Sequence, residues 1–404
     1  MMKIVQINTA LKSGSHGRIV EQVSRMAAER GFETTIVHGA RYVNKSQFTD
    51  IQVTTKNQEL LNGVRSLLFD AHGLGLRCAT KSLITKLEAI KPDVVHLHNI
   101  HGYYLNYQIL FDYLANTGIP VVWTLHDCWS MTGHCAYFDA VNCNLWKTGC
   151  HNCPQLESYP KAFLDNTKRN YELKKKCFTK VKNMTLVPVS NWLEGIVKQS
   201  YLSDYPTKVI HNGIDLSSFR PSEASGEISS NHKFKIIGVT ANWEKRKGFD
   251  DFIKLRRMLN DDYEIVMVGL DDKKLAMLPP GIKGLKRTES VKELAELYSS
   301  ADVFVNTTYE DNFPTTNLEA LACGIPVITY KTGGSPEAVS PETGIVVEKG
   351  DMLKLVEAIE SIKAKGKHCY STACRERAVS FYNKDDRFKD YIDLYENILN
   401  NSDI

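Results

Sequence analysis

Residues 309–334 read YEDNFPTTNLEALACGIPVITYKTGG. They follow the apolar segment 302–306 and lead into a second apolar segment, 326–330, and both segments are typical of buried β-strands. Between them, Pro314 suits the first turn of a helix, and Gly324 suits the position just after its end. This order of strand, helix and strand predicts a unit of a parallel sheet that is covered by helices.

The beginning of this helix also has the properties of an anion site. The backbone amides of residues 312–316, apart from Pro314, lie at its N-terminus. Unpaired N–H groups and the helix dipole at such a terminus favour the binding of a diphosphate. Two carboxylates lie nearby. Asp311 precedes the helix and could reach a sugar hydroxyl, and Glu319 lies inside it and could accept from ribose hydroxyls. The alternative is an acidic loop followed by a surface helix.

The same alternation of short apolar segments and amphipathic stretches fills the rest of the chain, in two similar series. It predicts an α/β protein with two doubly wound Rossmann-like domains that face each other across a cleft. The strands expected in the first series are 3–8, 34–37, 93–97, 121–125 and 185–189, and those in the second are 235–240, 264–269, 302–306 and 326–330.

The composition is that of an ordinary globular protein. The chain has 404 residues, of which 43% are hydrophobic and 24% charged, and this excludes a disordered or coiled-coil protein. A net charge of +3, from 50 basic and 47 acidic residues, gives no field that would favour nucleic acid as a partner. Charged residues within the first thirty and the lack of long apolar runs predict a cytoplasmic protein with reduced cysteines.

Against this background, the region around Asp311 and Glu319 resembles the carboxylate signature of the family 4 retaining glycosyltransferases, which have the two-domain GT-B fold. Seven residues separate the two carboxylates, and a small-residue helix end and the turn Gly333–Glu337 follow. The first position departs from the family pattern, because the usual glutamate is Asp311 here. Either Asp311 or the neighbouring Glu310 could fill that role.

The resemblance extends to a phosphate-binding loop at residues 241–248, ANWEKRKG. Lys247 stands at the family's lysine, whose ammonium would neutralise the β-phosphate as the leaving group departs. The family's arginine, normally five residues earlier, is Asn242 here, and Arg246 could supply the missing charge. The alternative is a solvated basic turn.

In the first half of the chain, the family places a glycine-rich loop between a strand and a helix. Residues Gly14, Gly17 and Arg18 fall at that place, with Gly17 toward the donor phosphate and Gly14 and Arg18 toward the acceptor.

Histidines follow two of the predicted strands in this half. His126 matches the family's histidine beside the transferring sugar, although a histidine at such a strand end can also be a hydrogen-bonded core residue. Asp127 could orient His126, since the second ring nitrogen usually needs a partner. His98 is expected to face the acceptor.

The resemblance implies transfer of a sugar from a nucleotide-diphosphate-sugar donor, UDP- or GDP-linked, to a saccharide or lipid-linked acceptor, without a catalytic metal or other cofactor. Bacterial members often build capsule, exopolysaccharide or lipopolysaccharide. The last helix would return to the first domain, which gives domains of residues 1–202 with 387–404, and of residues 203–386. Two alternatives are a nucleotide-sugar 2-epimerase of the same fold and a non-catalytic nucleotide-sugar-binding protein.

An insertion at about residues 128–160 in the first domain concentrates cysteine. Its thiols at Cys135, Cys143, Cys150 and Cys153 could close a structural zinc site, or could remain unmetallated. The following stretch, 168–182, has seven Lys or Arg against one acidic residue. It is either a solvated helix face or a contact with anionic lipid at the inner face of the membrane.

Overall fold

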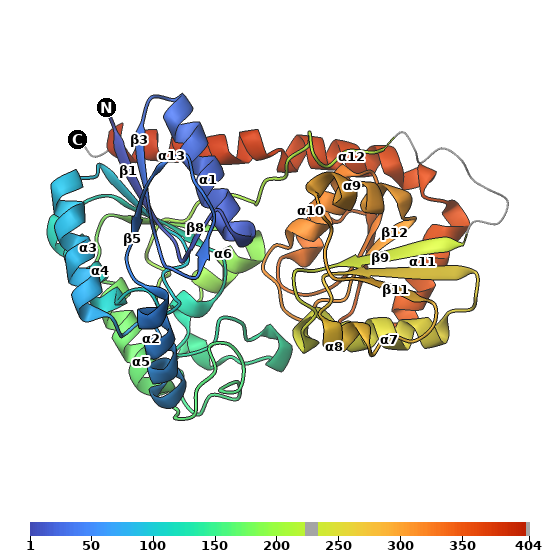
Figure 1. The fold of residues 1–404 in the computed structure, drawn as a ribbon, viewed down its shortest axis with the longest axis horizontal. Helices are drawn as coiled ribbons and strands as arrows, with labels where there is room; N and C mark the ends of the chain where they lie inside the picture. Colours follow the sequence, from blue (N-terminus) through green and yellow to red (C-terminus); the bar gives the residue numbers. More distant parts are fainter. Residues whose placement is uncertain (223–232, 401–404) are drawn as a thin grey trace. The chain divides into compact units, whose positions relative to one another are not determined.

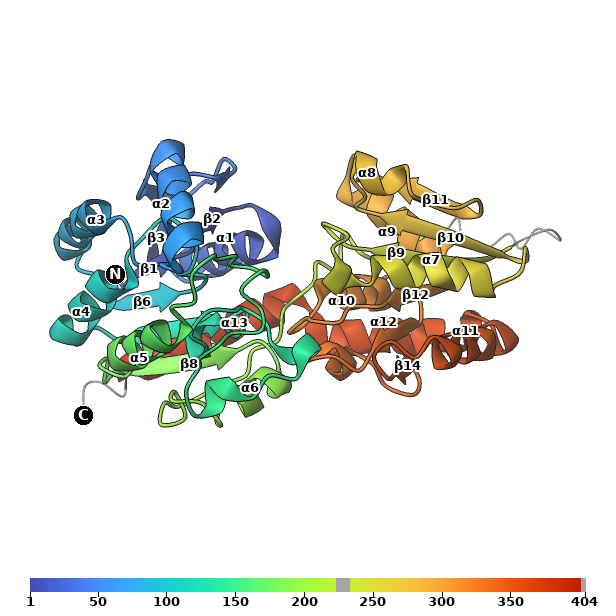
Figure 2. The ribbon, with the colours of Figure 1, turned by 90° about the horizontal axis from the view of Figure 1, so that it is seen from below.

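The computed structural model describes residues 1–222 and 233–400, and they form two compact α/β units (Figures 1 and 2). Unit 1 comprises Met1–His211 and the chain from Arg387 onward, and unit 2 comprises Asn212–Asp386. Each unit contains one six-stranded sheet, and every strand pair of both sheets is parallel. The prediction of two doubly wound Rossmann-like domains is confirmed.

In unit 1 the strand order is β5-β3-β1-β6-β7-β8, so the direction of winding reverses between β1 and β6. The central strands are apolar on both sides, as expected of strands with helices on each face. A small pair, β2 with β4, lies outside this sheet. The strands are β1 Lys3–Ile7, β2 Ala10–Leu11, β3 Glu33–His38, β4 Tyr42–Val43, β5 Thr49–Gln52, β6 Val94–Leu97, β7 Val121–Leu125 and β8 Met184–Pro188.

The α-helices of unit 1 that the structure describes bury apolar side chains, with the exception of α2, which is described below. Helix α13 begins at Lys384, at the end of unit 2, and its later part packs into the core of unit 1 through Phe388, Tyr391 and Tyr395. The helices are α1 Gly14–Glu29, α2 Lys56–Phe69, α3 Arg77–Ile90, α4 Tyr107–Thr117, η1 Trp129–Met131, η2 Asp139–Val141, η3 Leu145–Lys147, α5 Thr167–Phe178, α6 Asn191–Val197 and α13 Lys384–Asn400.

Unit 2 repeats the plan with strand order β11-β10-β9-β12-β13-β14, and its winding reverses between β9 and β12. Its strands are β9 Phe234–Val239, β10 Tyr263–Val268, β11 Ile282–Leu285, β12 Val303–Asn306, β13 Val327–Tyr330 and β14 Gly344–Val347. Its helices are η5 Lys245–Lys247, α7 Phe249–Met258, α8 Asp272–Leu275, α9 Val291–Ser300, α10 Thr315–Ala322, η6 Ser335–Ala338, α11 Met352–Lys365 and α12 His368–Tyr382.

The expected strands agree with the structure to within one or two residues, but the edge strands β5, β11 and β14 were not anticipated. Each has four residues, and β5 is largely polar. An edge strand has a neighbour on one side only and is less buried, so its sequence lacks the apolar pattern of a central strand. The expected glycine-rich loop is shorter than predicted, since α1 already begins at Gly14. The chain leaves unit 1 at His211 rather than at residue 202, because Lys208 and Ile210 still hydrogen-bond to β8.

No helix in the ranges 1–222 and 233–400 is both long and apolar enough to cross a membrane.

Candidate active site

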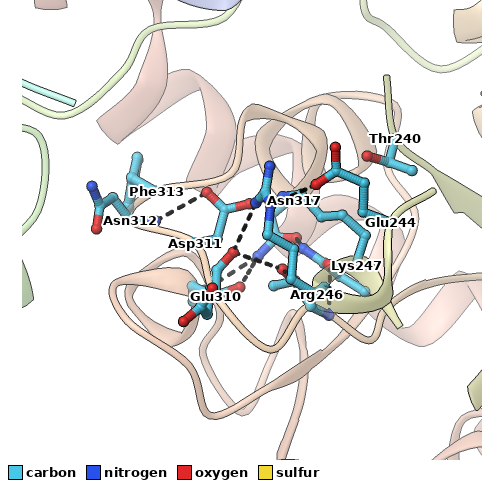
Figure 3. Close-up of polar contacts among 12 residues, drawn as sticks. Thr240, Glu244, Arg246, Lys247, Glu310, Asp311, Asn312, Phe313 and Asn317 are labelled. Atoms are coloured by element: carbon cyan, nitrogen blue, oxygen red, sulfur yellow. Dashed lines mark hydrogen bonds and ion pairs between the residues drawn. The ribbon is translucent and has the colours of Figure 1, made fainter. Parts of the chain in front are cut away.

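The strongest cluster of predicted site residues lies at the carboxyl edge of the unit 2 sheet. Lys247 follows β9 and Asp311 follows β12, and these two strands are neighbours at the point where the winding reverses. Ligands of doubly wound sheets bind at such switch points, because the loops after the two strands diverge there. The sequence therefore brings both residues to the place where the fold favours a ligand (Figure 3).

Lys247 and Asp311 form an ion pair between Nζ and Oδ2. Both side chains are only 18% exposed, so this charge pair is less screened by solvent than a surface pair. The other carboxylate oxygen, Oδ1, accepts from the backbone N–H of Asn312 at 3.0 Å. That amide was expected to be free for an anion, so the prediction is wrong for Asn312.

Glu244 accepts hydrogen bonds from Asn242 and Arg246, the two side chains that were considered as further contacts with the sugar donor. Asn242 Nδ2 donates to Glu244 Oε1 at 3.1 Å, and Arg246 Nε donates to Oε2 at 3.1 Å. Arg246 also donates from Nη1 to the carbonyl oxygen of Glu310 at 3.3 Å. The guanidinium therefore lies beside the Glu310–Asp311 loop with part of its charge balanced by Glu244, a residue that the sequence analysis did not identify.

Hydrogen bonds of Tyr309 hold the loop that carries Glu310 and Asp311. The backbone N–H of Tyr309 donates to the Arg246 carbonyl at 2.7 Å, and its hydroxyl donates to Asp251 Oδ2, also at 2.7 Å. Glu310 is 7% exposed, whereas Asp311 points toward Lys247. Of the two residues left open by the sequence, Asp311 is the one that pairs with the lysine.

Helix α10 begins next to this pair. Its N-cap is Pro314, whose side chain has no hydrogen-bonding atom, so it cannot cap the first-turn amides of Thr315 and the next residue. The preceding Phe313 is 3% exposed, and its carbonyl accepts from Asn212 Nδ2 at 3.0 Å. The helix dipole therefore contributes positive potential on the side where the ammonium of Lys247 lies.

Glu319, one turn into α10, is nearly buried, with 8% of its surface exposed. Its Oε2 accepts from the hydroxyl of Tyr298 on α9 at 2.9 Å. Burial, followed by the nearby Glu319 carboxylate, holds the pKa of Tyr298 well above its usual value, so Tyr298 remains a donor. Tyr298 thus orients the carboxylate predicted to bind ribose, and no motif in the sequence identified it.

In unit 1, a chain of hydrogen bonds fixes His126 at the end of β7. Gln6 Nε2 donates to Val20 O at 3.1 Å and to Ser24 Oγ at 2.7 Å, which leaves its Oε1 as an acceptor. His98 Nε2 lies 2.9 Å from that oxygen and must carry the proton. His98 Nδ1 is 3.3 Å from His126 Nε2.

The pKa values of His98 and His126 determine which ring nitrogens carry the protons in this chain of hydrogen bonds. Burial, and then the neighbouring imidazoles of His96, His126 and His16, hold the pKa of His98 well below its usual value. Burial and His16 lower the pKa of His126 to about 3. Both rings are therefore neutral at pH 7, so His98 Nδ1 accepts from His126 Nε2–H. It follows that Nδ1 is the hydrogen-bond acceptor of the His126 ring.

Asp127, which was expected to orient His126, has two further partners. Its Oδ2 accepts from His101 Nε2 at 2.7 Å, and its Oδ1 accepts from the backbone N–H of Trp129 at 2.9 Å. The expectation for His98 needs correction. His98 is 1% exposed with both ring nitrogens hydrogen-bonded, so it supports His126 and does not face an acceptor.

The predicted glycine-rich segment forms the first turns of α1. Gly17 is buried, and a Cβ at this position would lie 3.3 Å from the backbone nitrogen of Lys12 and 3.5 Å from Ala10 Cβ. Its small size therefore serves close packing of α1 against the preceding loop. Gly14 and Arg18 are exposed at the same helix end.

The four cysteines of the insertion come together. All four line one small cavity of about 10 Å³, together with His134 and His151. A hydrogen bond between the Cys135 and Cys153 thiols lowers the pKa of Cys153 to about 7. Among residues 1–222 and 233–400, however, no group of three or more His, Cys, Asp or Glu side chains is arranged to hold a metal ion.

The basic stretch after the insertion divides into two kinds of residue. Lys174 on α5 is 2% exposed, and its Nζ donates to the carbonyls of Trp129 at 2.8 Å and Thr132 at 3.0 Å. Burial lowers its pKa to about 7. This lysine anchors the insertion, contrary to the expectation of a solvated face, whereas the other six basic residues of 168–182 are exposed.

Comparison with known proteins agrees with this geometry. The family model "Glycosyltransferase Family 4" matches residues 16–218, about half of the chain, and "Glycosyl transferases group 1" matches residues 222–378. The chain therefore belongs to glycosyltransferase family 4. It is a glycosyltransferase with the GT-B fold, which makes the isomerase alternative unnecessary.

Individual relatives cover nearly the whole chain or less than half of it. The glycosyl transferase WcaC, assigned to colanic acid biosynthesis in Escherichia coli strain K12, is 25% identical over 98% of this chain and 100% of its own length. The GDP-mannose-dependent monoacylated alpha-(1-6)-phosphatidylinositol monomannoside mannosyltransferase of Corynebacterium glutamicum is 28% identical over 40% of this chain and 48% of its own.

Solved structures share the fold at low identity. Sucrose-phosphate synthase from Thermosynechococcus elongatus superposes with a TM-score of 0.72 at 16% identity, over 98% of this chain and 99% of that one. Anabaena HepE in complex with UDP-glucose gives a TM-score of 0.65 at 15% identity, over 98% and 100% of the two chains.

Proposed function

We propose that this glycosyltransferase takes a sugar from a nucleotide-diphosphate-sugar donor and transfers it, with retention of configuration, to a saccharide or lipid-linked acceptor. The observation that carries the proposal is the Lys247–Asp311 pair beside the start of α10, at the switch point of the unit 2 sheet. An ammonium and a helix N-terminus stabilise a departing diphosphate electrostatically.

The roles of the side chains follow from their chemistry. Lys247 neutralises the β-phosphate, and the first-turn amides of α10 bind its oxygens. Asp311 accepts from a hydroxyl of the transferring sugar, and the Nδ1 acceptor of His126 accepts from another. Glu319 accepts from the ribose hydroxyls with its carboxylate, which the hydroxyl of Tyr298 orients.

Catalysis in this proposal needs no metal ion or other cofactor, because the lysine and the helix N-terminus replace the cation at the diphosphate. The departing phosphate assists the acceptor hydroxyl on the same face of the sugar. Structural zinc in the insertion is a separate proposal. It would require Cys135, Cys143, Cys150 and Cys153 to move from their present positions, and the zinc content of the purified protein tests it.

The relatives indicate which nucleotide base and which product class to test first. Similarity to the colanic acid relative favours surface polysaccharide synthesis, and with it a location at the inner face of the membrane. The similar proteins include one described as GDP-mannose-dependent and one seen with UDP-glucose, so UDP- and GDP-linked sugars are the donors to test first.

A thermal-shift panel with UDP, GDP, ADP and their sugar conjugates tests the donor site, since a ligand that binds only the folded state raises the melting temperature. We expect a shift with one base, reduced in Glu319→Ala. A shift that Glu319→Ala retains would contradict the ribose assignment. Turnover with the matching sugar conjugate and an α- or β-anomer assignment of the product test retention, and no turnover of any donor would favour the non-catalytic alternative.

A further inference from the structure

Helix α2 (Lys56–Phe69) buries polar side chains and exposes apolar ones, whereas an ordinary surface helix does the reverse. The residues on its buried side are polar, namely Glu59, Asn62 and Ser66. Its exposed residues include five large apolar side chains, Leu60 (58% exposed), Leu61 (71%), Val64 (49%), Leu68 (41%) and Phe69 (52%).

This orientation is fixed by the partners of the inward polar groups. Glu59 accepts from the backbone N–H of Ala40 and from Thr54 Oγ1. Asn62 Nδ2 donates to the carbonyl of Tyr103 at 3.1 Å. Turning the helix to bury its leucines would leave these groups without partners, at a cost of about 1–3 kcal/mol each. The apolar face is therefore held toward the outside.

The apolar surface continues onto the segment before α5. Phe163 and Leu164 are 60% and 52% exposed, and the backbone N–H of Phe163 donates to the Leu67 carbonyl at 2.8 Å. Figure 1 shows α2 at the periphery of unit 1. We define the α2 surface as the exposed apolar side chains of Leu60, Leu61, Val64, Leu68, Phe69, Phe163 and Leu164.

Basic residues border this surface. Lys56 and Arg65 are exposed on α2, and Lys161 places its Nζ 6.0 Å from the centre of the Phe163 ring. Lys168 and Arg169, exposed at the start of α5, lie close to the end of α2, because Asn166 donates to the Phe69 carbonyl at 2.9 Å.

Three acidic residues near the α2 surface are buried or engaged, whereas Glu172 on α5 is exposed. Glu59 is buried, and Glu157 pairs with Lys161 at 2.6 Å. Asp165 accepts from the backbone N–H groups of Cys153 and Thr167. The pair of Glu157 with Lys161 is neutral, but Lys56, Arg65, Lys168 and Arg169 outnumber Glu172, so the border of the α2 surface carries a net positive charge.

We propose that the α2 surface docks onto an anionic lipid bilayer. Apolar side chains with a border of Lys and Arg match the acyl and headgroup layers of such a membrane. A second copy of the chain fits less well, since symmetric pairing through the α2 surface would bring the same basic residues together. This proposal rests on the proposed function in one respect. A lipid-linked acceptor or a growing surface polysaccharide would meet the enzyme at the membrane.

Binding of the full chain to vesicles tests the proposal, with flotation through a density gradient as the readout. The probes are vesicles of phosphatidylcholine alone and vesicles with about one third phosphatidylglycerol. The variants are Leu61→Glu, and Lys168→Glu combined with Arg169→Glu. Leu353→Glu is the matched control, because Leu353 is a 69% exposed leucine on α11 in unit 2. The melting temperature of each variant establishes that it is folded, and Leu61→Ser provides a second, uncharged test.

We expect the wild type to bind the anionic vesicles, and added salt to weaken that binding. Leu61→Glu should lower the partition coefficient by about tenfold or more, since a charge replaces a leucine side chain that the bilayer would bury. The double charge reversal should lower it by at least about tenfold. Leu353→Glu should bind like the wild type.

Equal binding by Leu61→Glu and the wild type, or no wild-type binding to anionic vesicles, would overturn the proposal. A dimer in light scattering that Leu61→Glu dissociates would assign the surface to a second copy instead. The thermal shift with UDP or GDP, recorded on the same variants, separates the two proposals. Vesicle binding without any donor response would refute the proposed function and leave the α2 surface standing.

Discussion

Units 1 and 2 present different chemistry at the same edge of the same kind of sheet. Unit 2 places a partly buried ion pair, Lys247 with Asp311, after adjacent strands. Unit 1 places neutral imidazoles, His98 and His126, whose tautomers are set by Gln6. A shared fold therefore does not determine the site, and a few side chains after the strands do. In the proposed function, charge serves the diphosphate and neutral hydrogen-bonding groups serve the sugar.

The largest effect is expected from Lys247→Ala, which removes the cation of the unit 2 site. Loss of one preorganised group that stabilises a developing oxyanion lowers kcat by about a hundred- to a thousandfold, or about 3–4 kcal/mol. Steady-state kinetics with the donor identified by the thermal-shift panel measures it.

Lys245→Ala is the matched control, because Lys245 is an exposed lysine of the same short helix η5. We expect near wild-type kcat for it. If both variants lost activity equally, general positive charge on this loop would be sufficient, and the specific pairing of Lys247 with Asp311 would be irrelevant to catalysis.

His126→Ala should have a smaller effect, about ten- to a hundredfold on kcat/KM, because it removes a neutral hydrogen-bond acceptor. The pKa of His126 is lowered to about 3, so the ring is neutral throughout the range from pH 5 to 8 and its loss should not change the shape of the pH–rate profile there. His151→Ala, at an exposed histidine, is the control. A wild-type profile that lost a limb in His126→Ala would show that this histidine titrates during catalysis.

Gln6→Leu sharpens the unit 1 side of the comparison, because it removes the acceptor that fixes the His98 tautomer. We expect kcat/KM to fall about fivefold, with a mixture of imidazole tautomers for His98 and His126 in nitrogen NMR spectra. Ser24→Ala, which removes only a partner of the Gln6 amide nitrogen, should keep one tautomer. An unchanged tautomer in Gln6→Leu would refute the positioning role.

Lys174→Met tests a buried cation that has a structural role only. Between about pH 7 and 10.5 the unfolded chain keeps this proton and the folded chain loses it. The unfolded state then binds more protons, so the free energy of unfolding should rise with pH in that window, by at most about 1.4 kcal/mol per pH unit. Lys174→Met should remove this slope in urea titrations, while a Lys175→Met control should keep it. Identical slopes in all three proteins would mean that Lys174 keeps its proton in the folded state.

Strand patterns and strand-end residues could be predicted from the sequence because they are local. The apolar segment 302–306, Pro314 and Gly324 define a strand and a helix by themselves, and parallel strands bring Lys247 and Asp311 to one edge. The positions of both residues follow from that topology.

The supporting residues could not be predicted, because they depend on contacts between distant segments. Gln6 reaches His98 only because β1 pairs with β6, and Tyr298 reaches Glu319 only because α9 packs beside α10. A polar residue in the apolar strand β1 was the one indication of Gln6. Helix α2 is a case in which a local pattern would mislead. The spacing of its leucines would predict a buried apolar stripe, but the hydrogen-bond partners of Glu59 and Asn62 determine which side faces inward.

The central claim, that Lys247 binds the β-phosphate of the donor, is tested most directly by calorimetric titration of a nucleoside diphosphate and its monophosphate against wild type and Lys247→Ala. The account predicts that the wild type prefers the diphosphate and that Lys247→Ala loses about 1.5–3 kcal/mol of that preference, as for a hydrogen bond to a charged group. The same preference in both proteins would contradict it.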